Sequence, residues 1–335
     1  MTPFKTKIHS VGTHLPKQVI KSDDIFKEIK SEQQYNIPTD WMSKNMGIVE
    51  RRVAPDSAQP SELAIPAAEK AIKNSNIDKK DIDAVIFCGI ERDRPEPATA
   101  HTIADELNIN ASIAFDVANA CFGFIDGMNI AAKFINSGTA KYALVVTGEV
   151  PTKILKTVVK NLKKGMDQAS AKNLIGALSV GDAGGAVLMG RSDDSSGFEL
   201  FRTFSQSQHT KKCYYQFDEN GVFDGQMRMA NLAALMIRNH SQLIQNTLDQ
   251  LGWNEFDWML SHQIGQRPFD KISELKGINP KRMIKTFDKL GNVASATFPI
   301  NFHKLSKNGK VKPGERIGGC FAGSGIVIGQ FGYSF

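Results

Sequence analysis

Residues 112–137 read SIAFDVANACFGFIDGMNIAAKFINS, and their hydrophobic periodicity changes part-way. Apolar side chains alternate over residues 113–117, which is typical of a β-strand. From Phe122 onward they recur at helical spacing and occupy nearly every face, which predicts a helix buried in a core. Cys121 therefore stands where a strand turns into a buried helix.

Two interpretations of Cys121 follow from this position. The unsatisfied backbone N–H groups at a helix N-terminus and the positive end of the helix dipole stabilise a thiolate. A nucleophile at a strand-turn-helix bend is also the arrangement of a nucleophile elbow, here with Cys in place of Ser. Alternatively, Cys121 is a small buried hydrophobic residue without chemistry. The remainder of the chain decides between the two.

The composition is that of a globular protein. The chain has 335 residues, of which 41% are hydrophobic and 23% charged, enough for two domains or one large duplicated unit. We expect no membrane span, because no apolar run reaches the ~18 residues required, and no secretory signal. The net charge of +6 suits an anionic ligand or an acidic partner but is too small for a nucleic-acid partner.

The four cysteines, Cys88, Cys121, Cys213 and Cys320, show no CxxC spacing. We therefore expect no zinc or other metal site and no disulfide framework. Unpaired cysteines are typical of reducing compartments, so the sequence predicts a cytoplasmic protein.

Strands and helices alternate along the chain, which predicts an α/β fold with covered strands. In the first half we expect strands at 4–11, 82–88, 113–117 and 142–147, and helices at 23–32, 61–75 and 98–107. The second half repeats the pattern with a helix at 229–251, an apolar strand at 256–260 and a glycine-rich strand at 323–329. The repetition predicts a duplication, with halves at 1–190 and 191–335 and a Lys-rich helical insertion at 152–178.

Two polar residues in the second half occupy positions that suit chemistry. His262 follows an apolar strand directly, at the end of the sheet where α/β proteins place functional groups. Asn292 lies in a bend of small residues, 291–296. Each also has an ordinary explanation, His262 as a hydrogen-bonded buried polar group and Asn292 as a turn residue.

Together with Cys121, these residues follow a known order. The chain resembles, over nearly its whole length, the β-ketoacyl-ACP synthase III family of the thiolase superfamily. The resemblance rests on Trp41 with GIVERR at 47–52, FD at 115–116 before CFGF at 121–124, GDAGGA at 181–186, SHQ at 261–263, GN at 291–292 and GSG at 323–325. It implies a duplicated thiolase fold in five αβαβα layers, a homodimer, and a catalytic triad of Cys121, His262 and Asn292.

The implied activity is that of an acyltransferase that performs a Claisen condensation with a malonyl or β-keto thioester, in fatty-acid or secondary-metabolite biosynthesis. Its substrates would be thioesters of coenzyme A or of an acyl carrier protein, without a further cofactor. A Cys thiolate suits attack on a thioester, and His and Asn N–H groups can both donate to the enolate oxygen that forms next. The backbone N–H groups of Cys121 and of the turn with Gly323 and Ser324 would form the oxyanion hole.

Several positions depart from the family pattern. Trp41 is expected to stack on the adenine of coenzyme A, or else to be a packed surface aromatic, but Asn45 stands where the family has an Arg. Gln263 is expected to contact substrate, and Ile264 and Gly265 follow it where the family has Ala and Asn. These departures point away from the standard initiation of fatty-acid synthesis.

The loop at 91–100 resembles that of enzymes that join two long acyl thioesters head to head. In those enzymes a Glu from the partner subunit serves as the base, and Glu96 is the matching position. Glu96 is otherwise a solvated loop residue. The insertion at 152–178 would cover an acyl tunnel and offer its lysines to an acidic carrier protein, or present a plain solvated face.

Two other functions stay open at this point. A biosynthetic thiolase would use Cys320 as its second cysteine, although GNV at 291–293 stands where thiolases have Gly-His-Pro. A non-catalytic scaffold partner of a paralogous synthase would have no need to keep Cys121, His262 and Asn292 together.

Overall fold

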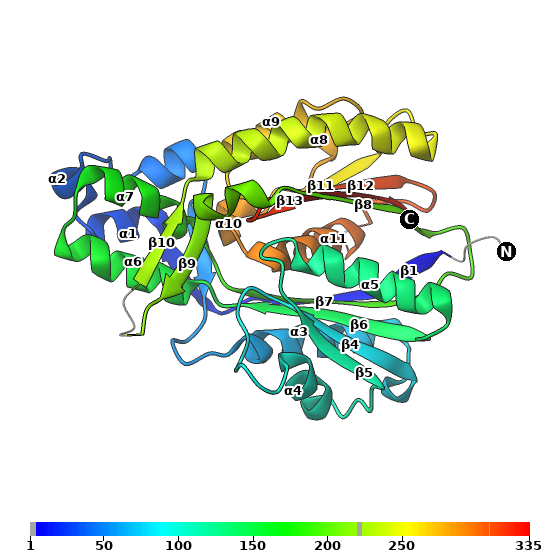
Figure 1. Cartoon of the computed structure of the whole chain (residues 1–335). Coiled ribbons are helices and arrows are strands. Elements are labelled where there is room, and N and C mark those ends of the chain that lie inside the picture. The colour runs from blue at the N-terminus through cyan, green and yellow to red at the C-terminus, as the bar shows by residue number, and fades with distance from the viewer. Residues whose placement is uncertain (1–4, 220–222, 308) are drawn as a thin grey trace.

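The computed structural model describes residues 5–219, 223–307 and 309–335. Two sheets alternate with three layers of helices (Figure 1), so the predicted five-layered αβαβα arrangement is confirmed. Among the described residues, no helix is both long enough and apolar enough to cross a membrane.

The first sheet has the strand order β1-β7-β6-β4-β5. Its strands are β1 Thr6–His14, β4 Ile82–Cys88, β5 Ile113–Val117, β6 Tyr142–Glu149 and β7 Ala183–Arg191. Helices α3 (Pro60–Ser75) and α4 (Thr99–Glu106) cover its outer face, and α5 (Gly123–Ser137) covers the inner face. The strands predicted at 82–88 and 113–117 coincide with β4 and β5, which run parallel.

The second sheet has the strand order β11-β12-β13-β8. Its strands are β8 Gly197–Ser205, β11 Trp258–Ser261, β12 Arg316–Gly323 and β13 Val327–Ser334. Helices α8 (Met229–Leu251) and α9 (Gln266–Ser273) lie outside it, and α11 (Thr297–Lys307) lies beside α5 between the two sheets. Phe298 of α11 stacks on Phe124 of α5 and meets Phe331 of β13 edge-on, so one aromatic core joins the two sheets.

Glycines let helix α3 approach the first sheet closely. A Cβ atom added at Gly12, Gly148 or Gly184 would come within about 2 Å of a backbone oxygen of α3. These glycines lie on the adjacent strands β1, β6 and β7. The helix backbone therefore rests directly on the strands, and no larger residue fits at these positions.

We expect Gly184→Ala to destabilise the protein by about 3 kcal/mol, because its methyl group would overlap a backbone oxygen that cannot move alone. Urea denaturation of the purified variant measures the change in the free energy of unfolding. Gly252→Ala is the matched control: Gly252 ends α8 with open space around it, so only its left-handed backbone conformation opposes the substitution, at about 1 kcal/mol. Equal losses for both variants would contradict the packing explanation.

Shorter elements complete the first half. They are β2 Gln18–Lys21 paired with β3 Glu50–Val53, α1 Ser22–Glu28, α2 Ser31–Tyr35 and a π-helical turn at Met42–Met46. The single helix predicted at 23–32 is wrong, since Lys30 adopts a left-handed conformation that separates α1 from α2. Helix α3 begins at Pro60, one residue before the predicted start at 61.

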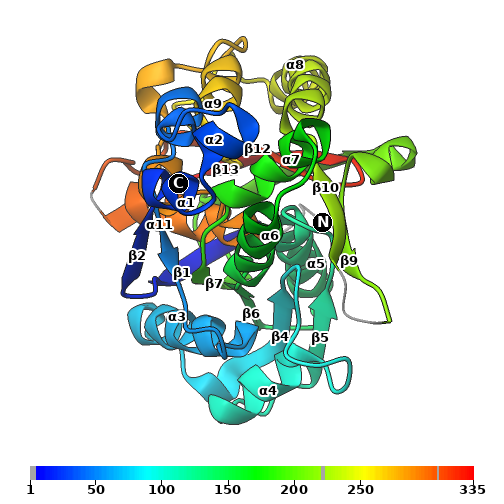
Figure 2. The same cartoon turned by 90° about the vertical axis from the view of Figure 1, so that its left-hand side faces the viewer.

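The segment predicted as a helical insertion forms α6 (Thr152–Lys164), α7 (Gln168–Leu174) and a 3-10 turn at Ile175–Ser179. The apolar stripe of α6 is buried against Tyr35, whose hydroxyl donates to the carbonyl oxygen of Leu162 at 2.5 Å. A hairpin that the sequence did not indicate, β9 Cys213–Phe217 and β10 Phe223–Met227, lies at the same end of the molecule (Figure 2). A short helix, α10 Phe287–Leu290, precedes the bend that contains Asn292.

Candidate active site

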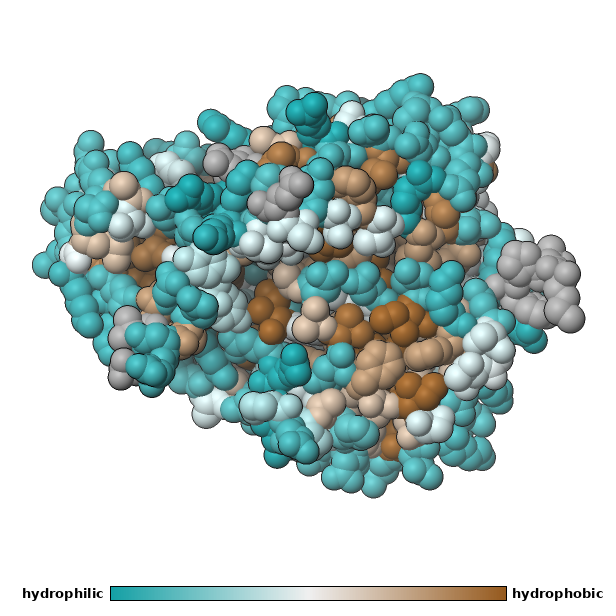
Figure 3. All heavy atoms as spheres, viewed as in Figure 1, coloured by the Kyte–Doolittle hydropathy of each residue, from teal (hydrophilic) through white to brown (hydrophobic). Residues whose placement is uncertain are grey.

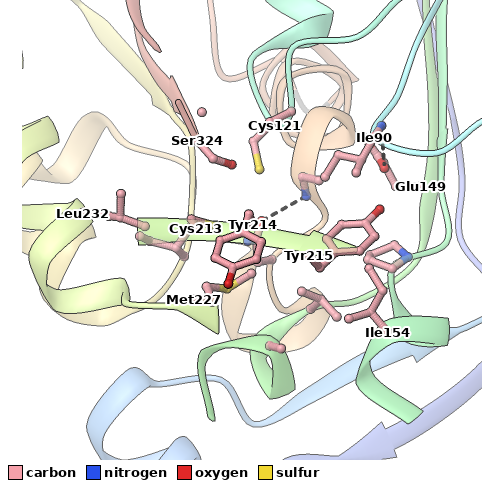
Figure 4. Close-up of a pocket in the computed structure, with 18 of the residues that line it drawn as sticks. Ile90, Cys121, Glu149, Ile154, Cys213, Tyr214, Tyr215, Met227, Leu232 and Ser324 are labelled. Atoms are coloured by element: carbon pink, nitrogen blue, oxygen red, sulfur yellow. Dashed lines mark hydrogen bonds between the residues drawn. The ribbon is translucent and has the colours of Figure 1, made fainter. Parts of the chain in front are cut away.

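A cavity of about 470 Å³ lies where the two sheets and the helical segment meet. Its walls are mostly apolar, and they include side chains from both halves of the chain. Cys121, His262 and Asn292 all line it, together with Gly323 and Ser324. Figure 4 shows Cys121 and Ser324 at this cavity. The structure thus brings these five residues together, although they are up to about 200 positions apart in sequence.

Cys121 occupies the bend between β5 and α5. Ala120 precedes it in a left-handed conformation, with φ of +48°, which is uncommon for a residue with a side chain and marks a tight turn. Helix α5 begins two residues later, at Gly123. The bend aims the sulfur of Cys121 into the cavity (Figure 4).

The expected thiolate at the helix tip does not form at rest. Burial, and after it the charge of Glu149, raises the pKa of the Cys121 thiol above its ordinary value. The helix N-terminus therefore does not stabilise a thiolate in the resting protein, because loss of water outweighs the helix dipole at this position. Cys121 rests as a thiol.

His262 is a neutral imidazole at neutral pH. It follows β11, its backbone N–H donates to the carbonyl oxygen of Cys320 at 2.9 Å, and burial lowers the pKa of its ring to about 4. Its Nδ1 lies 3.5 Å from the hydroxyl of Thr297, which donates to the carbonyl oxygen of Ala294 at 2.8 Å. Because the Thr297 hydroxyl gives its hydrogen to Ala294, its oxygen can accept a hydrogen bond from Nδ1–H of His262. In this tautomer Nε2 carries no hydrogen and can accept a proton.

Asn292 is both a turn residue and a candidate donor. Its backbone N–H donates to Ser179 at 2.9 Å, and its side-chain Oδ1 accepts from the backbone N–H of Ala294 at 3.0 Å. These bonds fix the carboxamide and leave its NH₂ group for the cavity. The two explanations that the sequence left open are therefore compatible.

The turn at 323–325 lies against the start of α5. A Cβ atom added at Gly323 would lie 3.1 Å from the backbone nitrogen of Phe122, a tight contact, so a glycine favours the close approach of this turn to the residue after Cys121. Gly323 and Ser324 both line the cavity beside Cys121. This placement suits a pair of backbone donors for an oxyanion.

Comparisons with known proteins agree with this geometry. The model for 3-oxoacyl-(acyl-carrier-protein) synthase III matches residues 115–208, and the model for its C-terminal part matches residues 247–332. The acyl-CoA:acyl-CoA alkyltransferase of Xanthomonas campestris is 32% identical over 301 residues, which cover 87% of this chain and 86% of that protein.

The chain belongs to the 3-oxoacyl-ACP synthase III family. It is a condensing enzyme, an acyltransferase that performs a Claisen condensation of acyl thioesters on the thiolase fold. The β-ketoacyl-(acyl-carrier-protein) synthase III of Rickettsia bellii is 28% identical over 331 residues and covers 97% of this chain and 98% of its own. A crystal structure of Xanthomonas campestris OleA with bound lauric acid and lauroyl-CoA superposes with a TM-score of 0.92 at 27% identity, covering 99% of both chains.

Two residues expected to bind substrate do not line the cavity of this condensing enzyme. The carboxamide of Gln263 donates to Ile284 at 2.5 Å and accepts from the backbone N–H of Thr286 at 2.8 Å, so it anchors the segment before α10 instead. Trp41 is half-buried and stacks on Phe26 at 6.3 Å between ring centroids. Asn45, at the position of the missing Arg, donates to the carbonyl oxygen of Trp41 at 3.0 Å.

Glu96 is exposed on the loop before α4 and does not line the cavity of its own chain. Cys320 is fully buried in β12 and also lies outside the main cavity. Within the described residues, no group of three or more His, Cys, Asp and Glu side chains is placed to hold a metal ion.

The structure adds cavity residues that sequence reasoning missed. One of them is Glu149, the last residue of β6. His262 was selected because a polar residue follows an apolar strand, and the same rule would have selected Glu149. Glu91 and Tyr215 also line the cavity, and the Tyr215 hydroxyl lies 3.4 Å from the Glu91 carboxylate. No periodic pattern identifies the hairpin that carries Tyr215.

Proposed function

We propose that this enzyme joins two acyl thioesters head to head, without a malonyl donor. The observation that carries the proposal is the charge of the cavity: its described lining includes the carboxyl groups of Glu91 and Glu149 and neither Lys nor Arg. A malonyl carboxylate would lose water there without a cation to pair with, whereas a simple acyl chain fits mostly apolar walls. The 32% identity to an acyl-CoA:acyl-CoA alkyltransferase supports the same function.

The first step forms an acyl-enzyme. The Cys121 sulfur attacks the thioester carbonyl, its proton passes to Nε2 of His262, and the coenzyme A thiolate leaves and takes up that proton. Backbone N–H groups of Cys121 and of the turn with Gly323 and Ser324 stabilise the oxyanion, and loss of one such donor typically costs about 3 kcal/mol. The neutral state of His262 suits this role, because only the neutral ring accepts a proton.

The second step forms the carbon–carbon bond. A base removes a proton from the α-carbon of the second thioester, and the NH₂ group of Asn292 donates to the resulting enolate oxygen. The α-carbon attacks the acyl carbonyl, the bond to the Cys121 sulfur breaks, and the proton held by the base returns to that sulfur. When the Thr297 hydroxyl turns to donate to Nδ1, His262 carries its proton on Nε2 and becomes a second donor to the enolate.

We assign the base to Glu96 of a partner subunit. Strand β5 is an edge of the first sheet, and apolar side chains gather over β5 and α5 on the surface (Figure 3). Those that are partly exposed include Ile113, Phe115, Val117, Ile130 and Phe134. An unpaired strand edge with an apolar face favours pairing with a second copy, so we propose a homodimer through β5.

Substrate delivery and cellular location follow from the same chemistry. The thioester arrives on coenzyme A or on an acyl carrier protein, and the lysines of α6 that are exposed, such as Lys160 and Lys164, offer positive charge to an acidic carrier. A reaction that depends on a free thiol needs a reducing compartment, and all four cysteines are free, so we place the enzyme in the cytoplasm.

When a long-chain acyl-CoA is the only substrate, we expect the purified enzyme to join two molecules of it into a β-keto product with two acyl chains, with release of free coenzyme A. Mass spectrometry of extracted lipids detects this product. A companion reaction contains the same acyl-CoA together with malonyl-ACP that is labelled in its free carboxyl group. A product that forms only with malonyl-ACP, with release of labelled CO₂, would assign the decarboxylative synthase III reaction instead.

A further inference from the structure

Glu149 links the two halves of the active site through its carboxyl group. One oxygen, Oε1, accepts the backbone N–H of Ser295 at 3.3 Å and contacts the Ser295 hydroxyl, and Oε2 accepts the backbone N–H of Ile90 at 3.4 Å. Ser295 lies three residues after Asn292, and Ile90 follows β4. The side chain is only 1% exposed and lies at the side of the cavity that holds Cys121 (Figure 4).

The hydrogen-bond pattern around Ser295 accommodates this carboxyl group both with and without a proton. The Ser295 hydroxyl contacts three oxygens, those of Glu149, Thr147 and Cys88, and has one hydrogen to give. When the Ser295 hydroxyl donates its hydrogen to Glu149, the carboxyl group accepts it as an ionised carboxylate. When it donates instead to the backbone carbonyl oxygen of Cys88 at 3.1 Å, Glu149 donates to Ser295 and must be a protonated acid.

The ionisable groups nearby favour the protonated state of Glu149. Glu149 interacts electrostatically with four titratable side chains, those of Glu91, Tyr215, Cys88 and Cys121. Each of these side chains becomes negative when it ionises. Lys153 acts on Glu91, but no Lys or Arg lines the described cavity. Burial raises the pKa of Glu149 to about 8, so a pH change near neutrality alters its charge.

We propose that Glu149 is a positioning residue whose proton controls the reactivity of Cys121. While protonated, it ties the Asn292 bend to the end of β4 and leaves Cys121 free to lose its own proton. Once ionised, it repels the developing thiolate and holds Cys121 as an unreactive thiol. The inference rests on the proposed role of Cys121 as the acylated residue, but it concerns the thiol before any thioester binds.

The test is the pH profile of Cys121 alkylation by iodoacetamide, read by mass spectrometry on the peptide that contains Cys121. Glu149→Gln keeps a side chain that can bond Ser295 and removes the charge. We expect its alkylation midpoint to move to lower pH by about one unit, so that at about pH 9 it reacts about tenfold faster than the wild-type protein. A profile that is unchanged, or moved to higher pH, would overturn the proposal.

Glu91→Gln is the matched control. It removes another carboxyl group from the same cavity, but Glu91 makes no bond to the Asn292 bend and is not among the groups that shift Cys121. We expect a much smaller movement of its midpoint. An equal movement in both variants would mean that total cavity charge, and not Glu149, governs the thiol.

A second measurement does not depend on folding of the Glu149 variant. In Cys121→Ala protein, infrared difference spectra should show a protonated carboxylic acid at neutral pH, because burial raises the pKa of Glu149 to about 8. Absence of such a band at neutral pH would contradict the proposal. Neither assay contains a thioester, so a head-to-head reaction that fails in the substrate test leaves this result unaffected.

Discussion

Cys121→Ala is expected to abolish condensation, with product formation reduced by at least about 10³-fold, because the nucleophile that carries the acyl group is lost. The remaining cavity can still bind a thioester, so the loss should appear in kcat and not only in KM. Product formation from a long-chain acyl-CoA, measured under saturating conditions, checks this expectation. Far-UV circular dichroism of the variant confirms that it folds.

Cys320→Ala is the matched control for that result. Cys320 is a buried thiol like Cys88, but it lies in β12 outside the main cavity, and burial raises its pKa to about 12. We expect this variant to retain condensation. Loss of activity in Cys320→Ala comparable to that in Cys121→Ala would favour a thiolase mechanism with two working cysteines.

Glu96→Gln is expected to separate the two steps of the reaction. Acylation of Cys121 should proceed normally, because His262 and not Glu96 takes the proton of Cys121 in that step, while condensation should fall by about 10²–10⁴-fold through loss of the proposed base. Intact-protein mass shows the acyl-enzyme, and product analysis shows the missing second step. Wild-type condensation in this variant would remove Glu96 from the mechanism.

Mixed dimers test whether Glu96 acts across the subunit interface. A preparation of Glu96→Gln with Cys121→Ala contains dimers in which one cavity has an intact Cys121 and receives an intact Glu96 from its partner. We therefore expect activity to return when the two inactive proteins are mixed under conditions that allow subunit exchange. If mixing restores nothing while exchange is demonstrated, Glu96 does not serve the partner's site.

The parts of the site that could be predicted lie where buried elements turn. His262 comes directly after the apolar strand β11, Cys121 lies in the bend between β5 and α5, and Asn292 lies in a bend of small residues after α10. The structure places all three at one cavity. Strands β4 and β5 were predicted at their observed bounds because they are short apolar runs with clear turn signals on both sides.

The parts that could not be predicted depend on contacts between distant segments. The raised pKa of the Cys121 thiol arises from burial, which exists only in the folded protein. The sequence pattern shows that Cys121 stands near a helix N-terminus, but it does not show how deeply the thiol is buried. Gln263 stands beside His262 in sequence, yet its carboxamide turns toward the segment at 284–287. The hairpin that brings Tyr215 to the cavity has no periodic pattern, and only the tertiary structure reveals it.

The most direct test of the account is the mass of the intact protein after incubation with a long-chain acyl-CoA, followed by peptide mapping. The account predicts a gain equal to one acyl group, located on Cys121, absent from Cys121→Ala and lost when a second acyl-CoA completes the reaction. No mass gain in the wild-type protein, or an acyl group carried on another residue, would contradict it.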